Sequence, residues 1–245
     1  MMKTALSVEN LSKVYLRDKK KTSNVNALNN ITLQVKQGEI FGLLGPNGAG
    51  KTTFFYILAG LLHPSSGNIT FNDALITKKS IKERADLGIV YLPQEPSIFR
   101  ALSVFDNVKS ALELRKINKK DLNHKTEEIL QDFDIKSIAL QKGDQLSGGQ
   151  RRRVEIARSI ALNPKFIMLD EPFAGIDPIA IQELKRLIEK LSKKGLGILI
   201  SDHNVKATMD ICEEIFVINQ GSIISKGTPE EVSQNEIVKK TYLGE

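Results

Sequence analysis

A glycine-rich run between an apolar segment and a helical pattern limits the possible folds of this 245-residue chain more than any other feature. The run reads Gly45-Pro46-Asn47-Gly48-Ala49-Gly50-Lys51-Thr52-Thr53 and matches G-x-x-x-x-G-K-[ST] at every fixed position. Residues 40–44 before it are apolar enough for a buried strand, and residues 52–62 after it have the pattern of a helix. Strand, glycine loop and helix in this order predict a phosphate-binding loop in an α/β fold.

The chemistry of this loop suits a nucleoside triphosphate. Its glycines allow backbone N–H groups to point at phosphate oxygens, and the following helix adds the positive end of its dipole. We expect Lys51 to reach the β- and γ-phosphates and the Thr52 hydroxyl to coordinate Mg²⁺. The alternative is a glycine-rich turn that matches by accident, and the flanking strand and helix argue against it. The sequence therefore predicts binding of a nucleoside triphosphate such as ATP, with Mg²⁺.

Composition excludes several other classes of protein. Hydrophobic residues make up 41% of the chain and charged residues 26%, as in an ordinary globular protein, and no apolar run has the length of a membrane span. The single cysteine, Cys212, excludes an internal disulfide and a multi-cysteine metal site. The first nine residues lack the apolar centre of an export signal. We therefore expect a cytoplasmic protein, docked on a membrane through another protein.

The net charge of +6 fits either nucleic acid or the anionic face of a membrane. The lysines are spread along the chain, however, and residues 17–21, a dense basic cluster, lie between two predicted strands. A solvated hairpin tip explains that cluster better than a binding patch. Charge alone therefore decides neither partner.

The N-terminal third alternates loosely between polar and apolar residues. Residues 7–15 and 30–35 read as strands, and with the strand before the phosphate loop they predict an antiparallel β element beside the main core. Tyr15, on the first of these strands, could return to stack on a nucleotide base. A packing aromatic on a strand explains Tyr15 equally well.

The remaining chain predicts an α/β P-loop NTPase fold with a RecA-like, mainly parallel sheet. Short apolar runs at 87–92, 166–169, 196–200 and 215–219 read as strands of a covered sheet, while residues 103–158 read mostly as helix. We expect a single domain over 1–245. Residues 1–94 and 163–245 would form the β element and the core, and residues 95–162 an inserted helical sub-domain.

A second glycine pair stands directly before a strong helical run at 151–162. The segment reads Leu146-Ser147-Gly148-Gly149-Gln150, so it offers another helix N-terminus with accessible backbone N–H groups. One nucleotide rarely needs two such sites from one chain. The two sites are therefore expected to face each other from different copies.

Acidic and imidazole side chains follow two of the apolar strands. Asp170 and Glu171 end the strand at 166–169, where α/β sheets bind ligands. Asp170 is placed to hold Mg²⁺, and Glu171 to polarise an attacking water. His203 follows the strand at 196–200 and is expected to contact the γ-phosphate. The alternatives are carboxylates that cap the next helix and a histidine that is only a satisfied polar side chain.

Together these motifs resemble those of the ATP-binding subunits of ABC transporters, over nearly the whole chain. Residues 146–150 match the family's signature sequence, which is more specific than the phosphate loop. The resemblance implies that Gln94 senses Mg²⁺ and the membrane partner, and that residues 174–177 cross a dimer interface. It also implies a metal-binding Asp170, a catalytic Glu171 and a switch role for His203.

Finer features resemble the lipopolysaccharide-export subfamily. They are residues 91–100, 151–158, 170–175 and 242–245. The resemblance implies a groove after Gln94 that receives short helices of two membrane subunits, with Phe99 as an apolar anchor and Arg100 as a polar contact. The alternative is a surface loop with an incidental phenylalanine. Three departures are a longer segment at 17–26, Gln150 where that subfamily often has Glu, and a shorter tail.

These features lead to a hypothesis of a head-to-tail homodimer. Two ATP molecules would be held at the interface, each between residues 45–53 of one copy and 147–150 of the other. Hydrolysis would open the dimer and drive two transmembrane permease subunits docked near residues 94–100. The chain would contact neither nucleic acid nor the transported substrate. Alternatives are the ATPase of a branched-chain amino acid importer and a soluble ABC ATPase without a transporter.

Overall fold

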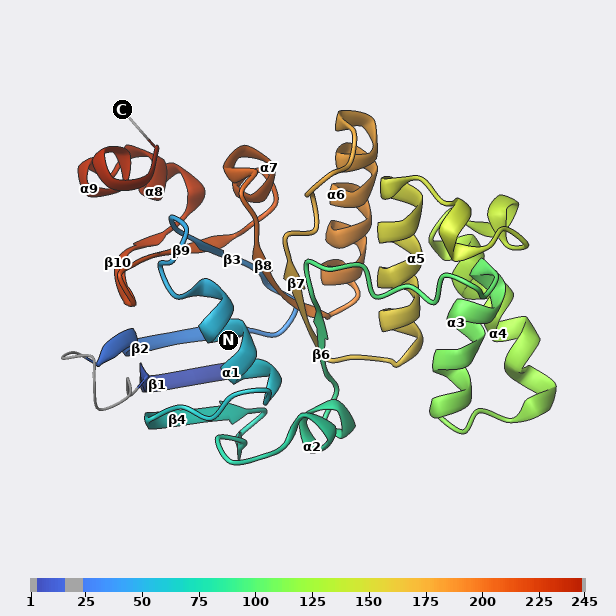
Figure 1. Ribbon diagram of the computed structural model, residues 1–245, viewed down its shortest axis with the longest axis horizontal. Coiled ribbons are helices and arrows are strands. Elements are labelled where there is room, and N and C mark those ends of the chain that lie inside the picture. Colours follow the sequence, from blue (N-terminus) through green and yellow to red (C-terminus); the bar gives the residue numbers. More distant parts are fainter. Residues whose placement is uncertain (1–3, 16–23, 244–245) are drawn as a thin grey trace.

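The strands form two sheets in a computed structural model that describes residues 4–15 and 24–243 (Figure 1). The smaller sheet is antiparallel, with the strand order β2-β1-β4-β5. Its strands are β1 (Thr4–Tyr15), β2 (Val25–Lys36), β4 (Ser66–Phe71) and β5 (Ala74–Leu75). The predicted N-terminal antiparallel element is thus present. The basic cluster predicted at a hairpin tip, residues 17–21, lies outside the described residues.

The larger sheet has six strands in the order β10-β9-β3-β8-β7-β6. All neighbours pair in parallel except β10, which pairs antiparallel with β9. The strands are β3 (Ile40–Leu44), β6 (Ile89–Leu92), β7 (Phe166–Asp170), β8 (Gly197–Ser201), β9 (Glu214–Asn219) and β10 (Ser222–Gly227). Every residue of β3, β7 and β8 is buried, because both faces of this sheet are covered.

The placement of β3 corrects one prediction. The strand before the phosphate loop was expected to join the antiparallel element, but β3 pairs in parallel with β8 and β9. A turn at residues 37–38, with Gly38 at φ 71, carries the chain out of the first sheet and into the second. A short connection favours a hairpin only when the two strands bury the same face. The fully buried β3 instead needs cover on both sides.

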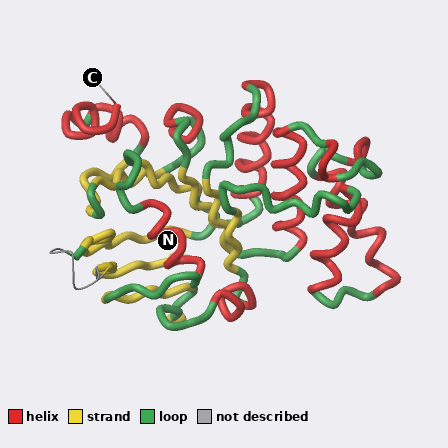
Figure 2. The backbone as a smooth tube through the Cα atoms, viewed as in Figure 1, coloured by secondary structure: helices red, strands yellow, loops and turns green. Residues whose placement is uncertain are grey.

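The helices are unevenly distributed around the sheets, and Figure 2 shows a helical block on the side away from the antiparallel sheet. That block contains α3 (Val104–Leu114), α4 (Lys119–Asp132) and α5 (Gly148–Ala161). Helix α6 (Pro178–Lys193) packs next to α5, and α1 (Lys51–Ala59) follows β3. The short helices are α2 (Ile81–Asp86), α7 (Val205–Met209), α8 (Pro229–Gln234) and α9 (Glu236–Val238). None of the described helices has the length and apolar character needed to cross a membrane.

Alternate residues of β3 enter two hydrophobic clusters on opposite faces of the sheet. Ile40 and Leu44 join a cluster that includes α3, α4, α5 and α6. Phe41 and Leu43 join a second cluster that includes α1 and the antiparallel sheet. This alternation is the two-residue period of a strand. The helical block thus shares its cluster with the sheet, and the sub-domain boundaries at 94/95 and 162/163 stay predictions.

Candidate functional site

The phosphate loop connects the carboxyl end of β3 to α1, in close contact with neighbouring backbone. A Cβ atom added to Gly45 would lie 2.1 Å from the carbonyl oxygen of Ile218, and one added to Gly50 would lie 2.5 Å from that of Ala27. Both glycines have positive φ, 155° and 111°. Only glycine fits at these two positions, because any side chain would displace backbone rather than a mobile side-chain end.

Lys51, the first residue of α1, folds back over this loop. Its Nζ atom donates to the carbonyl oxygens of Gly45 at 2.7 Å and Pro46 at 3.0 Å. Burial lowers the pKa of Lys51, while the nearby charges of Glu171 and Asp170 act in the opposite direction. The ammonium group is thus held at the loop by weak neutral acceptors, which phosphate oxygens could replace.

A cavity of about 430 Å³ lies beside the loop and α1. Side chains that the sequence predicted from three separate motifs meet there: the loop with Lys51, the carboxylates Asp170 and Glu171, and His203. Parallel strands end at one edge of a sheet, so the ends of β3, β7 and β8 bring these motifs together. The lining residues are Val25, Asn26, Ala27, Asn47, Gly48, Ala49, Gly50, Lys51, Thr52, Thr53, Asp170, Glu171, His203, Gln220 and Gly221.

Asp170, the last residue of β7, is held from two sides. Its Oδ2 atom accepts a hydrogen bond from the Tyr91 hydroxyl at 3.0 Å, and its backbone carbonyl accepts one from Arg152 at 2.8 Å. Burial raises the pKa of Asp170, and the hydrogen bond from Tyr91 partly opposes this. Burial and the neighbouring Asp170 also raise the pKa of Tyr91, so its hydroxyl remains a donor. The orientation of the carboxylate is therefore set before any ligand arrives.

Glu171 and His203 contact each other across the ends of β7 and β8. The Nε2 atom of His203 lies 2.8 Å from Oε1 of Glu171. Glu171 has φ 47°, an uncommon value for a residue with a side chain, and its N–H donates to Ser201 O at 2.7 Å. Such backbone conformations concentrate at functional sites. The strained turn aims the Glu171 carboxylate at the imidazole.

The second glycine motif begins α5 and lies outside this cavity. Ser147 caps the helix: its Oγ atom accepts from the Gln150 N–H at 3.3 Å, and its own N–H donates to Gln150 Oε1 at 3.0 Å. A Cβ atom on Gly148 would lie 2.8 Å from the carbonyl of Gly175, and one on Gly149 would lie 2.6 Å from Ala180 Cβ. Close packing against the next segment explains both glycines within one copy.

Comparison with known proteins identifies the family. The model of the ABC transporter family matches residues 28–174 of this chain. The chain belongs to the ABC transporter family. It is 48% identical over 241 residues to the lipopolysaccharide export system ATP-binding protein LptB of Haemophilus influenzae, with 98% of this chain and 97% of that one covered. The protein of the same name from Escherichia coli K12 is 47% identical, with the same coverage.

Solved structures agree with this family and with the predicted P-loop fold. An ATP-binding cassette of an ABC transporter in its ADP conformation has a TM-score of 0.87 and 26% identity, with 99% of this chain and 100% of that one covered. A dimeric post-hydrolysis cassette bound to ADP and phosphate has a TM-score of 0.80 and 25% identity, with 91% and 98% covered. The predictions of the fold and of an ABC ATPase are therefore confirmed, and the chain is a nucleotide-binding cassette.

Tyr15 and Gln94, both predicted to act at the nucleotide, do not line its cavity. Tyr15 ends β1, is 41% exposed and lies under Lys13, whose Nζ is 5.3 Å from the ring centroid. Its strand partner Val25 lines the cavity, so the ring is near the rim. Gln94 is exposed in the loop after β6. The roles of these residues in adenine and Mg²⁺ binding stay predictions.

Phe99 and Arg100 lie on a different surface of the cassette. Phe99 is 51% exposed, and the Arg158 guanidinium lies 4.6 Å from its ring centroid. Phe99 lines a second cavity of about 250 Å³ between β6, α3 and α5, here called the groove, and Arg100 is exposed beside Phe99. The groove is lined by Val90, Tyr91, Leu92, Pro93, Ser97, Phe99, Ser110, Ala111, Leu114, Arg158, Ser159 and Leu162.

Sequence reasoning missed the residues that hold the predicted ones in place. Besides Tyr91 and Arg152, these include Asp202, whose carboxylate accepts from the N–H groups of Phe173 and Asn204, each at 2.7 Å. Burial raises the pKa of Asp202. Its position directly before His203 was a signal, but Tyr91 and Arg152 meet Asp170 only through long-range contacts.

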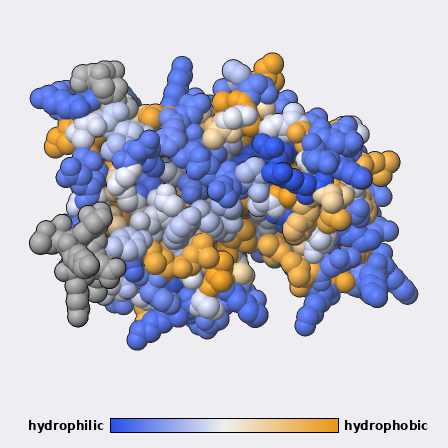
Figure 3. All heavy atoms as spheres, viewed as in Figure 1, coloured by the Kyte–Doolittle hydropathy of each residue, from blue (hydrophilic) through white to orange (hydrophobic). Residues whose placement is uncertain are grey.

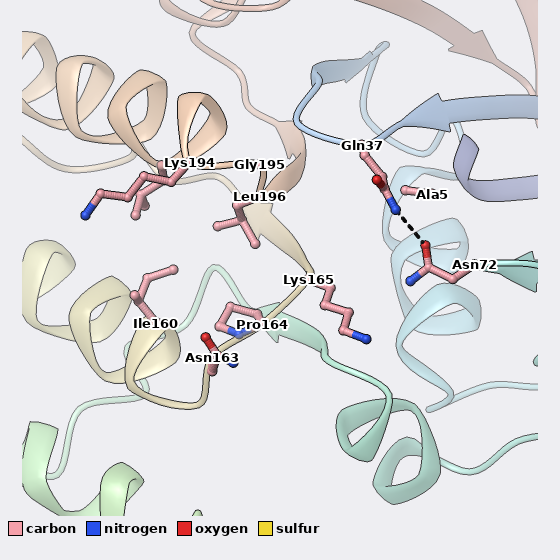
Figure 4. Close-up of a pocket in the computed structure, with 11 residues that line it drawn as sticks. Ala5, Gln37, Asn72, Ile160, Asn163, Pro164, Lys165, Lys194, Gly195 and Leu196 are labelled. Carbon is pink, nitrogen blue, oxygen red and sulfur yellow. Dashed lines mark hydrogen bonds between the residues drawn. The ribbon is translucent and has the colours of Figure 1, made fainter. Parts of the chain in front are cut away.

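A further cavity, of about 390 Å³, lies at the opposite edge of the sheet (Figure 4). Gln37, Lys165 and Leu196 on its wall come just before β3, β7 and β8, so it lies at the amino ends of these strands. One hydrogen bond crosses its wall, from Gln37 Nε2 to Asn72 Oδ1 at 3.2 Å. It contains none of the predicted site residues, and ligands of α/β sheets bind at the other edge.

Proposed function

We propose that this cassette is the ATP-hydrolysing subunit of a lipopolysaccharide export system and acts at the cytoplasmic face of the inner membrane. One observation carries the proposal: the 48% identity to the Haemophilus influenzae protein extends over 98% of this chain and 97% of that one. The fold and the nucleotide site are common to the whole family and do not distinguish one transported substrate from another. Similarity over 98% of the chain extends well beyond the motifs that all cassettes share.

The residues of the cavity fit ATP with Mg²⁺. Lys51 and the loop N–H groups suit the phosphates, and the exposed Thr52 hydroxyl and the Asp170 carboxylate are hard oxygen ligands. The described residues contain no group of three His, Cys, Asp or Glu side chains that could hold a metal by themselves. Mg²⁺ commonly binds through one or two protein oxygens together with phosphates, where it offsets their charge.

The proposed reaction is hydrolysis of the γ-phosphate, and the chain contributes mainly position and charge. Lys51 exchanges its two backbone acceptors for β- and γ-phosphate oxygens. Glu171 orients the attacking water and accepts its proton, while His203 turns from the Glu171 carboxylate to the γ-phosphate. Gln94 moves in from the exposed loop after β6, which links the site to the groove.

A second copy completes each site in this proposal. Ser147 is exposed and its motif lies outside the phosphate cavity, as expected if residues 147–150 act on the nucleotide of a partner copy. The dimeric cassette bound to ADP and phosphate, which this chain resembles, supports a pair of cassettes. Phe99 and Arg100 then contact two membrane subunits at the groove.

The proposal is tested with tagged Glu171→Gln protein, which should bind ATP, dimerise and hydrolyse very slowly. It is used with ATP to capture partners from detergent-solubilised native membranes, and mass spectrometry identifies them. Lipopolysaccharide-export membrane subunits are the expected result. Recovery of an amino-acid permease would keep the mechanism but change the proposed substrate from lipopolysaccharide to an amino acid. Recovery of no membrane protein would refute the transport role. Near-normal ATP hydrolysis by Glu171→Gln would refute the role of Glu171 in orienting the water. Loss of ATP binding by monomeric Ser147→Ala would refute the proposal that Ser147 acts only on the nucleotide of a partner copy.

A further inference from the structure

The loop between α3 and α4 carries a basic run that the proposed function does not use. It reads Arg115-Lys116-Ile117-Asn118-Lys119-Lys120, with four cations and no carboxylate. The side chains of Lys116, Lys119 and Lys120 are exposed, and no ion pair to another described residue holds any of them. Their charge is therefore available to something outside this chain.

Local structure explains only part of these charges. Lys116 follows Arg115, the C-cap of α3, with φ 55°, a left-handed position that favours glycine or asparagine, although the dipole at this end of α3 favours a cation. Lys119 and Lys120 occupy the first turn of α4, where the helix dipole disfavours cations, and Asp121 in the same turn offsets only part of this. Lys116 thus opposes the backbone preference of its turn, and Lys119 and Lys120 oppose the dipole of α4. Residues that oppose local preference in this way are often retained for a function.

The basic run is continuous with the groove. Leu114, which directly precedes the run, is 78% exposed and lines the groove together with Phe99. Arg115 donates to the backbone carbonyl of Ala161 at 3.3 Å, and the next residue, Leu162, also lines the groove. Figure 1 shows the α3–α4 loop at the lower right of the molecule. In Figure 3 this region projects as a hydrophilic lobe beside an apolar patch.

We propose that Arg115, Lys116, Lys119 and Lys120 bind the anionic headgroups of a lipid membrane and orient the groove toward it. The choice of a membrane rests on the proposed function, in which the groove receives membrane subunits. Basic side chains near an anionic leaflet each add to binding, and an exposed leucine among them suits the boundary between headgroups and acyl chains. Charge complementarity and continuity with the groove favour lipid over an ordinary solvated loop.

Vesicle sedimentation tests this inference on the full chain, without nucleotide or membrane subunits. The purified protein should sediment with vesicles in which phosphatidylglycerol makes up about one third of a phosphatidylcholine bilayer. It should stay in solution with phosphatidylcholine alone. Raising the salt from about 0.1 M to about 0.5 M should release most of the bound protein, because screening shortens the range of the attraction.

A matched pair of variants separates the basic run from net charge. The variant Lys116→Gln/Lys119→Gln/Lys120→Gln should bind anionic vesicles about a hundredfold more weakly, or about fivefold for each cation removed. The control Lys193→Gln/Lys206→Gln/Lys226→Gln loses the same charge from exposed positions on α6, α7 and β10 and should bind within a few-fold of the wild type. Both should keep basal ATP hydrolysis and the melting temperature, which shows that they fold.

Equal losses in both variants would overturn the inference, since net charge would then explain the binding. Binding that is unchanged in the first variant, or equal on neutral vesicles, would also overturn it. A first variant that keeps vesicle binding but loses captured membrane subunits would assign the run to a protein contact instead. Vesicle binding that depends on the run, with no membrane subunit captured by Glu171→Gln, would support this inference and refute the proposed function.

Discussion

Close packing of α5 on α6 at Gly149 makes this a position where one methyl group should have a clear effect. A Cβ atom at Gly149 would lie 2.6 Å from Ala180 Cβ, and beyond its own helix no other described atom lies within 4 Å. Neither Cβ can move by rotating a side chain. The substitution Gly149→Ala therefore has to push the start of α6 away from α5.

The expected cost follows from two opposing effects. Overpacking by one methyl in a close contact costs typically about 1–3 kcal/mol. Alanine in place of glycine near the start of α5 returns up to about 1 kcal/mol of helix propensity. The free energy of unfolding should thus fall by about 1–2 kcal/mol. For a chain of this size that lowers the melting temperature by about 3–6 °C.

The compensating substitution Ala180→Gly makes the prediction specific. Alone, it should cost about 0.5–1 kcal/mol because glycine is a poor helix residue. Combined with Gly149→Ala, it removes the methyl that the new Cβ would meet, so the double variant should be about 1–2 kcal/mol more stable than the sum of the single changes. Urea unfolding followed by circular dichroism measures all four proteins.

The same four proteins separate packing from a direct role for Gly149 at the nucleotide. The Cβ direction at Gly149 points toward α6, so the methyl should not obstruct a nucleotide on the outer side of the motif. ATP hydrolysis lost in Gly149→Ala should therefore return in the double variant to within a few-fold of Ala180→Gly. Strictly additive stability changes would refute the packing argument. Restored stability with no restored hydrolysis would refute the argument about direction.

Three further substitutions test the support of α1 and the charged residues of the cavity. Arg84 is fully buried and donates to the backbone carbonyls of Ile57 and Leu58 at the end of α1. Arg84→Met should therefore lower the free energy of unfolding, measured by urea titration, by about 2–4 kcal/mol. A loss below about 1 kcal/mol would contradict this. Burial raises the pKa of Asp170, so the charged carboxylate costs folding free energy at neutral pH. As the pH falls through the raised pKa toward the ordinary one, the wild type should gain stability relative to Asp170→Asn. Melting temperatures measured without Mg²⁺ test this, and a difference that does not depend on pH would refute it. Lys51→Met should weaken ATP binding about a hundredfold in calorimetry, and unchanged affinity would be inconsistent with the phosphate role. The melting temperature should change little, because the carbonyl partners of Lys51 can bond to water in the open cavity instead.

Much of the fold could be predicted from local pattern. The apolar runs at 166–169 and 196–200 became β7 and β8, and the helical runs after the two glycine motifs became α1 and α5. On α6 the apolar residues that recur at helical spacing form a buried face, with Leu184 and Ile188 at 1% and 0% exposure. These elements could be read because burial on one or both faces imposes a period of its own on the sequence. The shorter α2 and α7 have too few residues to show a period.

The candidate site was predictable only in the residues that belong to sequence motifs. The phosphate loop, Asp170, Glu171 and His203 stand in motifs with fixed neighbours, and the structure collects them around one cavity. Their supports could not be read in the same way. Arg152 belongs to a basic run on α5 that resembles a solvated face, yet it is 6% exposed and donates to the Asp170 carbonyl.

The sequence by itself determined which motifs this protein carries: a phosphate loop, acidic and imidazole groups at strand ends, and a second glycine motif at the start of a helix. Tertiary structure alone decided which sheet β3 joins, how Tyr91 and Arg152 orient Asp170, and that the α3–α4 loop extends the groove with a basic edge. The physical reason is range. Backbone geometry and phosphate binding depend on residues a few positions apart, whereas strand pairing and buried hydrogen bonds depend on contacts between segments tens of residues apart.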